Sequence, residues 1–164
     1  LLEKQVDAIA GYVQGYAPGV EIGAGQEVDI LWYADCDVVA ISNGIIVHND
    51  LLESNPDLVR RFVRATVRGF LYGHESPDEA VSFLHKYSDT IEDERARREM
   101  EFSWKSWVPD SARGTPLGWM PPEDWEKTLE TLAEYGDVSQ VPDPEDVYTN
   151  EFVPEGEEFI PPQP

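Results

Sequence analysis

Apolar residues recur at helical spacing in the middle of the chain, where they predict a long helix that begins at Asn55. Asn55 is a good N-cap residue, and Pro56 suits the first helical position because its missing N–H has no partner there in any case. The apolar face behind it comprises Leu58, Val59, Phe62, Val63, Val67, Phe70 and Leu71. We therefore expect Phe62 to be buried and the neighbouring arginines to be solvated.

Three further helices are predicted downstream. Ser76-Pro77 opens one, and a second begins near Thr90 and runs to about Trp107. A third follows Pro121-Pro122 and ends near Tyr135, because Glu123 and Asp124 suit a helix N-terminus and Gly136 suits its end. Helices should thus dominate residues 55–135.

Short apolar runs in the first third of the chain predict strands rather than helices. They span residues 8–10, 28–33 and 41–47, and each is followed by turn-forming or polar residues. Two or three strands followed by several helices is the pattern of an α/β chain. From residue 138 onward Pro, Asp and Glu dominate, so residues 154–164 should be a mobile acidic tail.

Four blocks of sequence, in this order, carry a family resemblance. They are Val6-Asp-Ala-Ile-Ala-Gly-Tyr12, the segment Ala40–Asp50, the helix Asn55–Gly69, and Gly118-Trp-Met-Pro-Pro-Glu-Asp-Trp125 running on to Tyr148-Thr-Asn-Glu-Phe-Val-Pro154. Together they resemble the NMT1/THI5-like family. Its members are solute-binding proteins of ABC importers for thiamine-pyrimidine precursors, riboflavin-like compounds and related small molecules.

The resemblance implies a fold and a domain organisation. The expected fold is α/β, the C-terminal portion of a two-lobed type II periplasmic-binding-protein fold with few strands followed by several helices. Residues 1–36 would end the second lobe up to the return crossover, 37–153 would close the first lobe, and 154–164 would be the tail. A missing N-terminal part would carry any membrane anchor, and the location would be extracytoplasmic.

The charge balance excludes some partners. With 33 acidic and 12 basic residues the net charge is −21, so nucleic acid and anionic membranes are not expected partners. The four lysines, which are few beside so many acids, favour a salt-adapted, halophilic protein. An acidic extracellular protein from an ordinary organism is the alternative. Cys36 is the single cysteine, so neither an internal disulfide nor a Cys-pair zinc site is expected.

Few features of the sequence indicate a catalytic site. His48, His74 and His85 lie in unrelated contexts and are interpreted as surface or capping residues. Neighbouring acids such as Asp35 and Asp37 are expected by chance in so acidic a chain, so no metal site is predicted. We expect no enzyme and no cofactor. The alternative is a THI5-like pyrimidine synthase, whose active residues would lie mainly in the missing N-terminal lobe.

A first group of candidate ligand-binding residues follows the strand expected at 8–10. Gly11 lets a ligand approach the backbone, Tyr12 can stack on a flat ring, and Gln14 can bond the edge of that ring. Ligands of open α/β sheets bind beyond the carboxyl ends of strands, where these residues would lie. In the other interpretation Tyr12 and Tyr16 simply pack within the lobe.

A second group follows the next two strands. Asp35 or Asp37 would suit the nitrogens of an aminopyrimidine, or would belong to a solvated hinge loop. Asn43, between Ser42 and Gly44, either lines the cleft floor or only turns the chain. Trp104, Trp107, Trp119 and Trp125 are interpreted as core or helix-docking residues, with Trp119 the best candidate for an exception.

The predicted function is capture of a small ring-containing solute by lobe closure, with delivery to the membrane permease of an ABC importer. The resemblance favours a thiamine-pyrimidine precursor, and a sulfonate, nitrate or riboflavin-type solute is the alternative. An acidic interaction module without a small-molecule site is a third hypothesis. Uncovered apolar faces also lead us to expect self-association of this chain.

Overall fold

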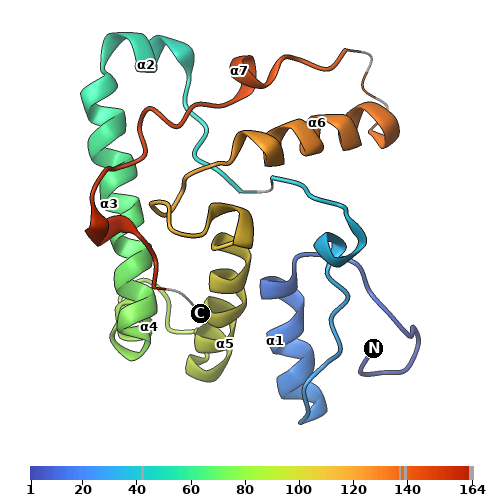
Figure 1. Cartoon of the computed structure of the whole chain (residues 1–164). Helices are drawn as coiled ribbons and strands as arrows, with labels where there is room; N and C mark the ends of the chain where they lie inside the picture. Colours follow the sequence, from blue (N-terminus) through green and yellow to red (C-terminus); the bar gives the residue numbers. More distant parts are fainter. Residues whose placement is uncertain (42, 137, 139, 163–164) are drawn as a thin grey trace. The chain divides into compact units, whose positions relative to one another are not determined.

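The computed structural model describes residues 1–41, 43–136, 138 and 140–162, and its regular elements are helices (Figure 1). The α-helices are α1 (Val13–Ala24), α2 (Asn49–Ser54), α3 (Pro56–Glu75), α4 (Pro77–Leu84), α5 (Asp93–Trp107), α6 (Pro122–Tyr135) and α7 (Pro144–Val147). Short 3-10 turns lie at Tyr33–Cys36, Asp110–Ala112 and Glu157–Phe159.

The predicted α/β fold, as the C-terminal portion of a two-lobed type II periplasmic-binding-protein fold, is wrong. Residues 8–10, 28–31 and the described part of 41–47 are irregular, and no strand forms in the described part of the chain. A strand needs a neighbouring strand to satisfy its N–H and C=O groups, and these runs have none beside them. The backbone N–H of Ile41 instead donates to Thr128 Oγ1 on α6 at 2.9 Å, and Ile46 is 98% exposed.

The helices expected after residue 55 are confirmed. Asn55 accepts from the backbone N–H of Leu58 at 3.2 Å, as an N-cap should, and α6 has the predicted bounds of Pro122 and Tyr135. The expectation for Phe62 is wrong, because its side chain is 58% exposed while Val59, Val67 and Leu71 are buried. The residues after the run at 8–10 were expected to form a turn, but they form the helix α1, which has Pro18 inside it.

The chain divides into two compact units, and each is described by itself. Unit 1 comprises Leu1–Leu31 with Phe70–Trp107, and unit 2 comprises Trp32–Gly69 with Val108–Pro164. The lobe boundaries predicted from the sequence at 36 and 153 remain predictions.

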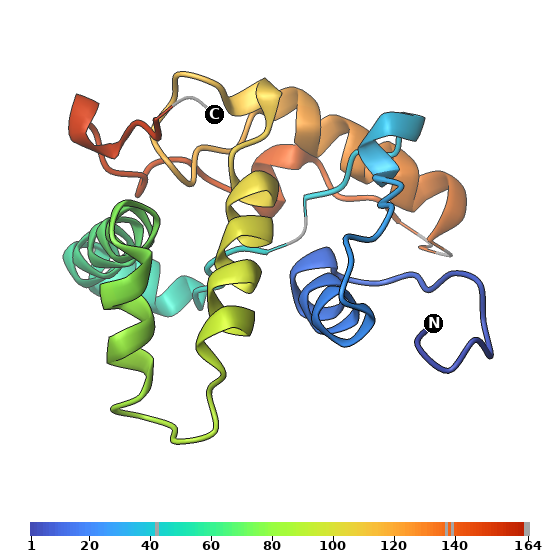
Figure 2. The same cartoon turned by 90° about the horizontal axis from the view of Figure 1, so that it is seen from below.

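Unit 1 is built around α5, which packs against both α1 and α4. Figure 2 shows α4 and α5 as neighbours joined by the 85–92 loop. Its buried side chains include Ala17 and Pro18 of α1, Val81 of α4, and Phe102 and Trp104 of α5. The ring of His74 stacks on Trp104 with 3.7 Å between ring centroids, which ties the last turn of α3 to α5.

Unit 2 combines the first part of α3 with α6, α7 and the C-terminal segment, which lies alongside α3 in Figure 1. Its buried apolar side chains include Val59, Val67, Leu117, Leu129 and Phe159. Phe159 is 0% exposed, and its carbonyl accepts from the N–H of Leu117 at 2.8 Å. Phe159, which lies in the segment expected to be a mobile tail, therefore forms part of the core of unit 2, whereas residues 155–158 are exposed. Gln163 and Pro164 of that expected tail lie outside the described residues.

None of the helices in the described ranges combines the length and the apolar character that a membrane span requires.

Candidate functional site

The first predicted group of ligand-binding residues lies at the start of α1, in unit 1. Tyr12 is the N-cap residue of α1 and its side chain is 62% exposed. Gly11 lies under the ring of Tyr16, which occupies the space that a Cβ at Gly11 would need. Gln14, in the first turn, is half-buried. The structure thus presents Tyr12 as an open aromatic surface and uses Gly11 to accommodate Tyr16.

The second predicted group lies in unit 2. Asp35 is part of the 3-10 turn Tyr33–Cys36, and Asp37 caps that turn in the left-handed conformation with a φ of 61°. The N–H of Asp37 donates to the carbonyl of Ala34 at 3.2 Å, which brings both carboxylates onto one exposed turn. Asn43 is exposed as well, and the neighbouring Ser42 lies outside the described residues. These residues and those at α1 belong to separate units, so each group is described alone.

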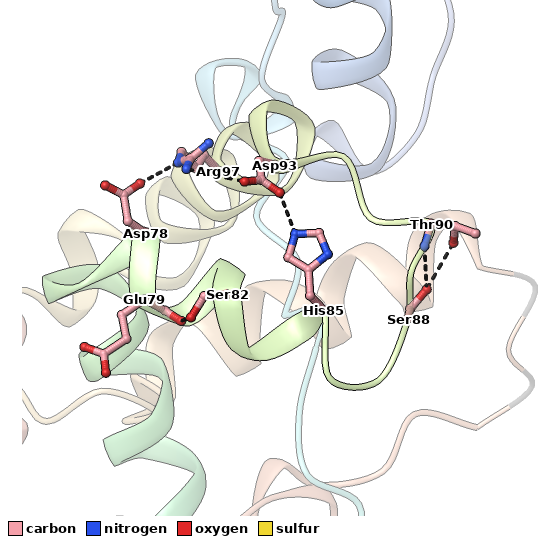
Figure 3. Close-up of polar contacts among 8 residues, drawn as sticks. All are labelled: Asp78, Glu79, Ser82, His85, Ser88, Thr90, Asp93 and Arg97. Atoms are coloured by element: carbon pink, nitrogen blue, oxygen red, sulfur yellow. Dashed lines mark hydrogen bonds and ion pairs between the residues drawn. The ribbon is translucent and has the colours of Figure 1, made fainter.

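A polar cluster joins α4 to α5 in unit 1 (Figure 3). The His85 Nε2 atom lies 2.6 Å from Asp93 Oδ1, and Arg97 Nε donates to Asp78 Oδ1 at 2.6 Å. A histidine beside a carboxylate is two thirds of a nucleophilic triad. Within the described chain, however, no hydroxyl is hydrogen-bonded to His85, and Ser88 pairs with Thr90 at 3.0 Å. We interpret the cluster as a tie between two helices.

A second charged network joins α1 to α5. Arg98 Nε donates to Glu21 Oε2 at 2.7 Å, and Arg98 Nη1 donates to Glu101 Oε2 at 2.6 Å. The hydrogen bond from Arg98 lowers the pKa of Glu21 below its ordinary value, and the bonds to Glu21 and Glu101 raise the pKa of Arg98. The Glu21 side chain is almost buried. We therefore interpret the pair as a contact that stabilises the packing of α1 on α5, and not as part of a ligand site.

A hollow of about 630 Å³ lies beside Trp119 in unit 2. Trp119, the candidate exception among the tryptophans, is 39% exposed, whereas Trp104 is buried in unit 1. The acidic residues that share the hollow, Glu151, Glu155 and Glu157, were missed, because the composition after residue 138 had indicated an irregular acidic segment. No signal in the sequence alone places them beside Trp119.

The described residues do not indicate a metal site. The part of the chain that the structure describes holds no group of three or more His, Cys, Asp or Glu side chains able to hold a metal ion.

Comparison with known proteins agrees with the family resemblance carried by the sequence blocks. Residues 1–80 match the family model described as NMT1/THI5 like, and three of the four blocks lie within that range. The chain is also similar to the riboflavin-binding protein RibY of Chloroflexus aurantiacus, with 33% identity over 159 residues that cover 95% of this chain and 45% of the relative. It therefore spans about half the length of that relative. Over residues 1–80 the chain is thus similar to the NMT1/THI5-like family.

Proposed function

We propose that this protein is part of the solute-binding component of an ABC importer and that it binds a flat, ring-containing solute outside the cytoplasmic membrane. The similarity to a riboflavin-binding protein over 95% of this chain is the observation that carries the proposal. The family match over residues 1–80 supports it, since solute-binding proteins of importers are the members that the sequence resembles. The proposed partner is the permease of the importer, in the membrane. We also propose that the protein is anchored at the outer face of that membrane and that copies of this chain associate.

The proposed ligand class is a flat heteroaromatic ring system with riboflavin as the first candidate. The similarity to RibY favours a riboflavin-type solute over the thiamine-pyrimidine precursor that the sequence blocks had favoured. An exposed tyrosine such as Tyr12 offers a stacking surface to either ring. The carboxylates of Asp35 and Asp37 can accept from ring N–H or amino groups. Anionic sulfonate or nitrate fits a chain of net charge −21 less well.

The first prediction concerns this binding. Riboflavin titrated into the protein should show saturable quenching of flavin fluorescence, and the flavin should be recovered unchanged, as expected of a carrier rather than an enzyme. The thiamine-pyrimidine precursor, titrated by calorimetry, tests the second ligand. Absence of saturable binding for both compounds would contradict the proposal.

A tyrosine variant tests the proposed stacking surface. Tyr12→Ala should weaken riboflavin binding by about tenfold or more, because an aromatic contact and its buried area contribute on the order of 1–3 kcal/mol. The matched control is Tyr87→Ala, since Tyr87 is an exposed tyrosine of the same unit outside the proposed site. Unchanged affinity in Tyr12→Ala, with a lowered melting temperature, would assign Tyr12 to packing.

A further inference from the structure

The hollow beside Trp119 has the size of a small-molecule site. Its volume of about 630 Å³ lies within the range of about 300–1,000 Å³ that is usual for ligand pockets. Residues 116–119 form one wall and residues 150–160 form the other, and both belong to unit 2. The apolar lining consists of Pro116, Trp119, Val153, Pro154 and Ile160.

Hydrogen bonds join the two segments that line this hollow. The Asn150 side chain accepts from the N–H of Met120 at 3.0 Å and donates to its carbonyl at 2.8 Å. The N–H of Leu117 donates to the carbonyl of Phe159 at 2.8 Å, and Phe159 is fully buried. These contacts hold the two segments together, so a ligand would have less of the hollow to order.

Trp119 lines the hollow and remains partly exposed. The residue is 39% exposed, whereas a tryptophan that only packed against the protein would be largely covered. The amide of Asn150 is already engaged with Met120. The groups left to recognise a polar ligand are carboxylates.

Three glutamates line the hollow and only one has a basic partner. Glu151 pairs with Arg60 of α3. In the described ranges no basic side chain lies within ion-pair distance of Glu155 or Glu157. Surplus carboxylates are common in a chain of net charge −21 and indicate nothing by themselves. Beside a hollow that Trp119 lines, they favour a positively charged occupant.

We propose that this hollow binds a small organic cation that carries a flat ring, with a quaternary or protonated amine over the face of Trp119. Cations bind over indole faces more strongly than over other rings, and Glu155 and Glu157 add charge complementarity. The ring of the ligand lies against the apolar wall formed by Val153, Pro154 and Ile160. None of its residues is among the proposed solute-binding residues, and the inference does not depend on that function.

A titration with three probes of one ring type tests the proposed site. Benzyltrimethylammonium, benzyl alcohol and benzoate carry the same ring with a positive, a neutral and a negative group, and binding is followed by calorimetry and by ligand NMR. The cation should bind saturably and at least about fivefold more tightly than the alcohol, as expected for a cation on an indole face. Benzoate should not bind. Equal binding of cation and alcohol would overturn the proposal.

Two sets of variants locate the binding. Trp119→Leu should weaken cation binding by about fivefold or more, and Trp119→Phe should retain part of it, because phenyl rings also attract cations. The double variant Glu155→Gln/Glu157→Gln should weaken it too. Glu126→Gln/Glu130→Gln, on the exposed surface of α6, makes the same change in net charge and should have no effect. An equal loss in this control would overturn the proposal in favour of a general charge effect.

Riboflavin titrations on the same variants keep the two proposals apart. Trp119→Leu should bind riboflavin as the unaltered protein does, and Tyr12→Ala should bind benzyltrimethylammonium normally. Loss of both ligands in Trp119→Leu, with an unchanged melting temperature, would show one shared site and overturn the separate one. Cation binding without any riboflavin binding would leave this inference standing and contradict only the proposed function.

Discussion

Individual residues show how far periodicity predicts burial. Phe62 lies in the predicted apolar face of α3 and yet is 58% exposed, because that face is wider than the surface that covers it. Arginines of α3 instead make some of its contacts with the C-terminal segment. Arg60 pairs with Glu151, and Arg64 lies 4.7 Å from the ring centroid of Phe159. Phe159 is fully buried, although it lies in a segment whose composition had indicated a mobile tail.

A pair of phenylalanine variants tests this assignment. Phe159→Ala should lower the free energy of unfolding by about 3–5 kcal/mol, as expected for a fully buried phenylalanine. Phe62→Ala should change it by no more than about 0.5 kcal/mol, the range for surface substitutions. Urea denaturation of both variants measures the two values. A large loss in Phe62→Ala with a small one in Phe159→Ala would restore the face predicted from the sequence.

At the scale of elements, helix pairs in unit 1 are tied by charged side chains as well as by apolar packing. Arg98 of α5 binds Glu21 of α1, and Arg97 of α5 binds Asp78 of α4. The two ties differ in burial, since the Glu21 side chain is 10% exposed and that of Asp78 is 82% exposed. Exposed pairs contribute little because water screens them, so the Arg98–Glu21 pair should be the more important of the two.

The Arg98–Glu21 pair predicts a dependence of stability on pH. Glu21 has a lowered pKa in the folded protein, so between the folded and unfolded pKa values the unfolded state binds more protons. The stabilisation is present above the unfolded value of about 4.3 and is lost as the pH falls through the folded one. Arg98→Gln should cost about 1–2 kcal/mol at neutral pH, and this cost should shrink near pH 3.

Urea denaturation of the unaltered protein and of Arg98→Gln, at neutral pH and at about pH 3, provides the measurement. Arg95→Gln is the matched control, because its partner Glu99 is exposed on the same helix and its removal should have little effect at either pH. If Arg98→Gln lowers the free energy of unfolding equally at both pH values, Arg98 is not the cause of the lowered pKa of Glu21.

At the scale of the whole molecule, the dominant property is a net charge of −21. Repulsion among carboxylates opposes compact states, and salt screens it over a length that shortens from about 30 Å at 0.01 M to about 3 Å at 1 M. The melting temperature should therefore rise steadily from about 0.05 M to about 2 M potassium chloride. A flat or falling melting temperature over this range would contradict salt adaptation, and the acidity would then affect solubility alone.

The sequence by itself determined the helices α3, α4 and α6, because caps, prolines and apolar spacing act within a few residues of one another. It also carried the resemblance to the NMT1/THI5-like family that residues 1–80 match. It also marked Trp119 as different from the other tryptophans. Only the tertiary structure decided that the runs at 8–10, 28–33 and 41–47 form no sheet, since strands depend on partners far away in the sequence. It likewise decided that Asn150 and Phe159 fix the wall of the hollow beside Trp119. Helical hydrogen bonds are local, whereas strand pairing and the docking of a segment require distant contacts that no local pattern records.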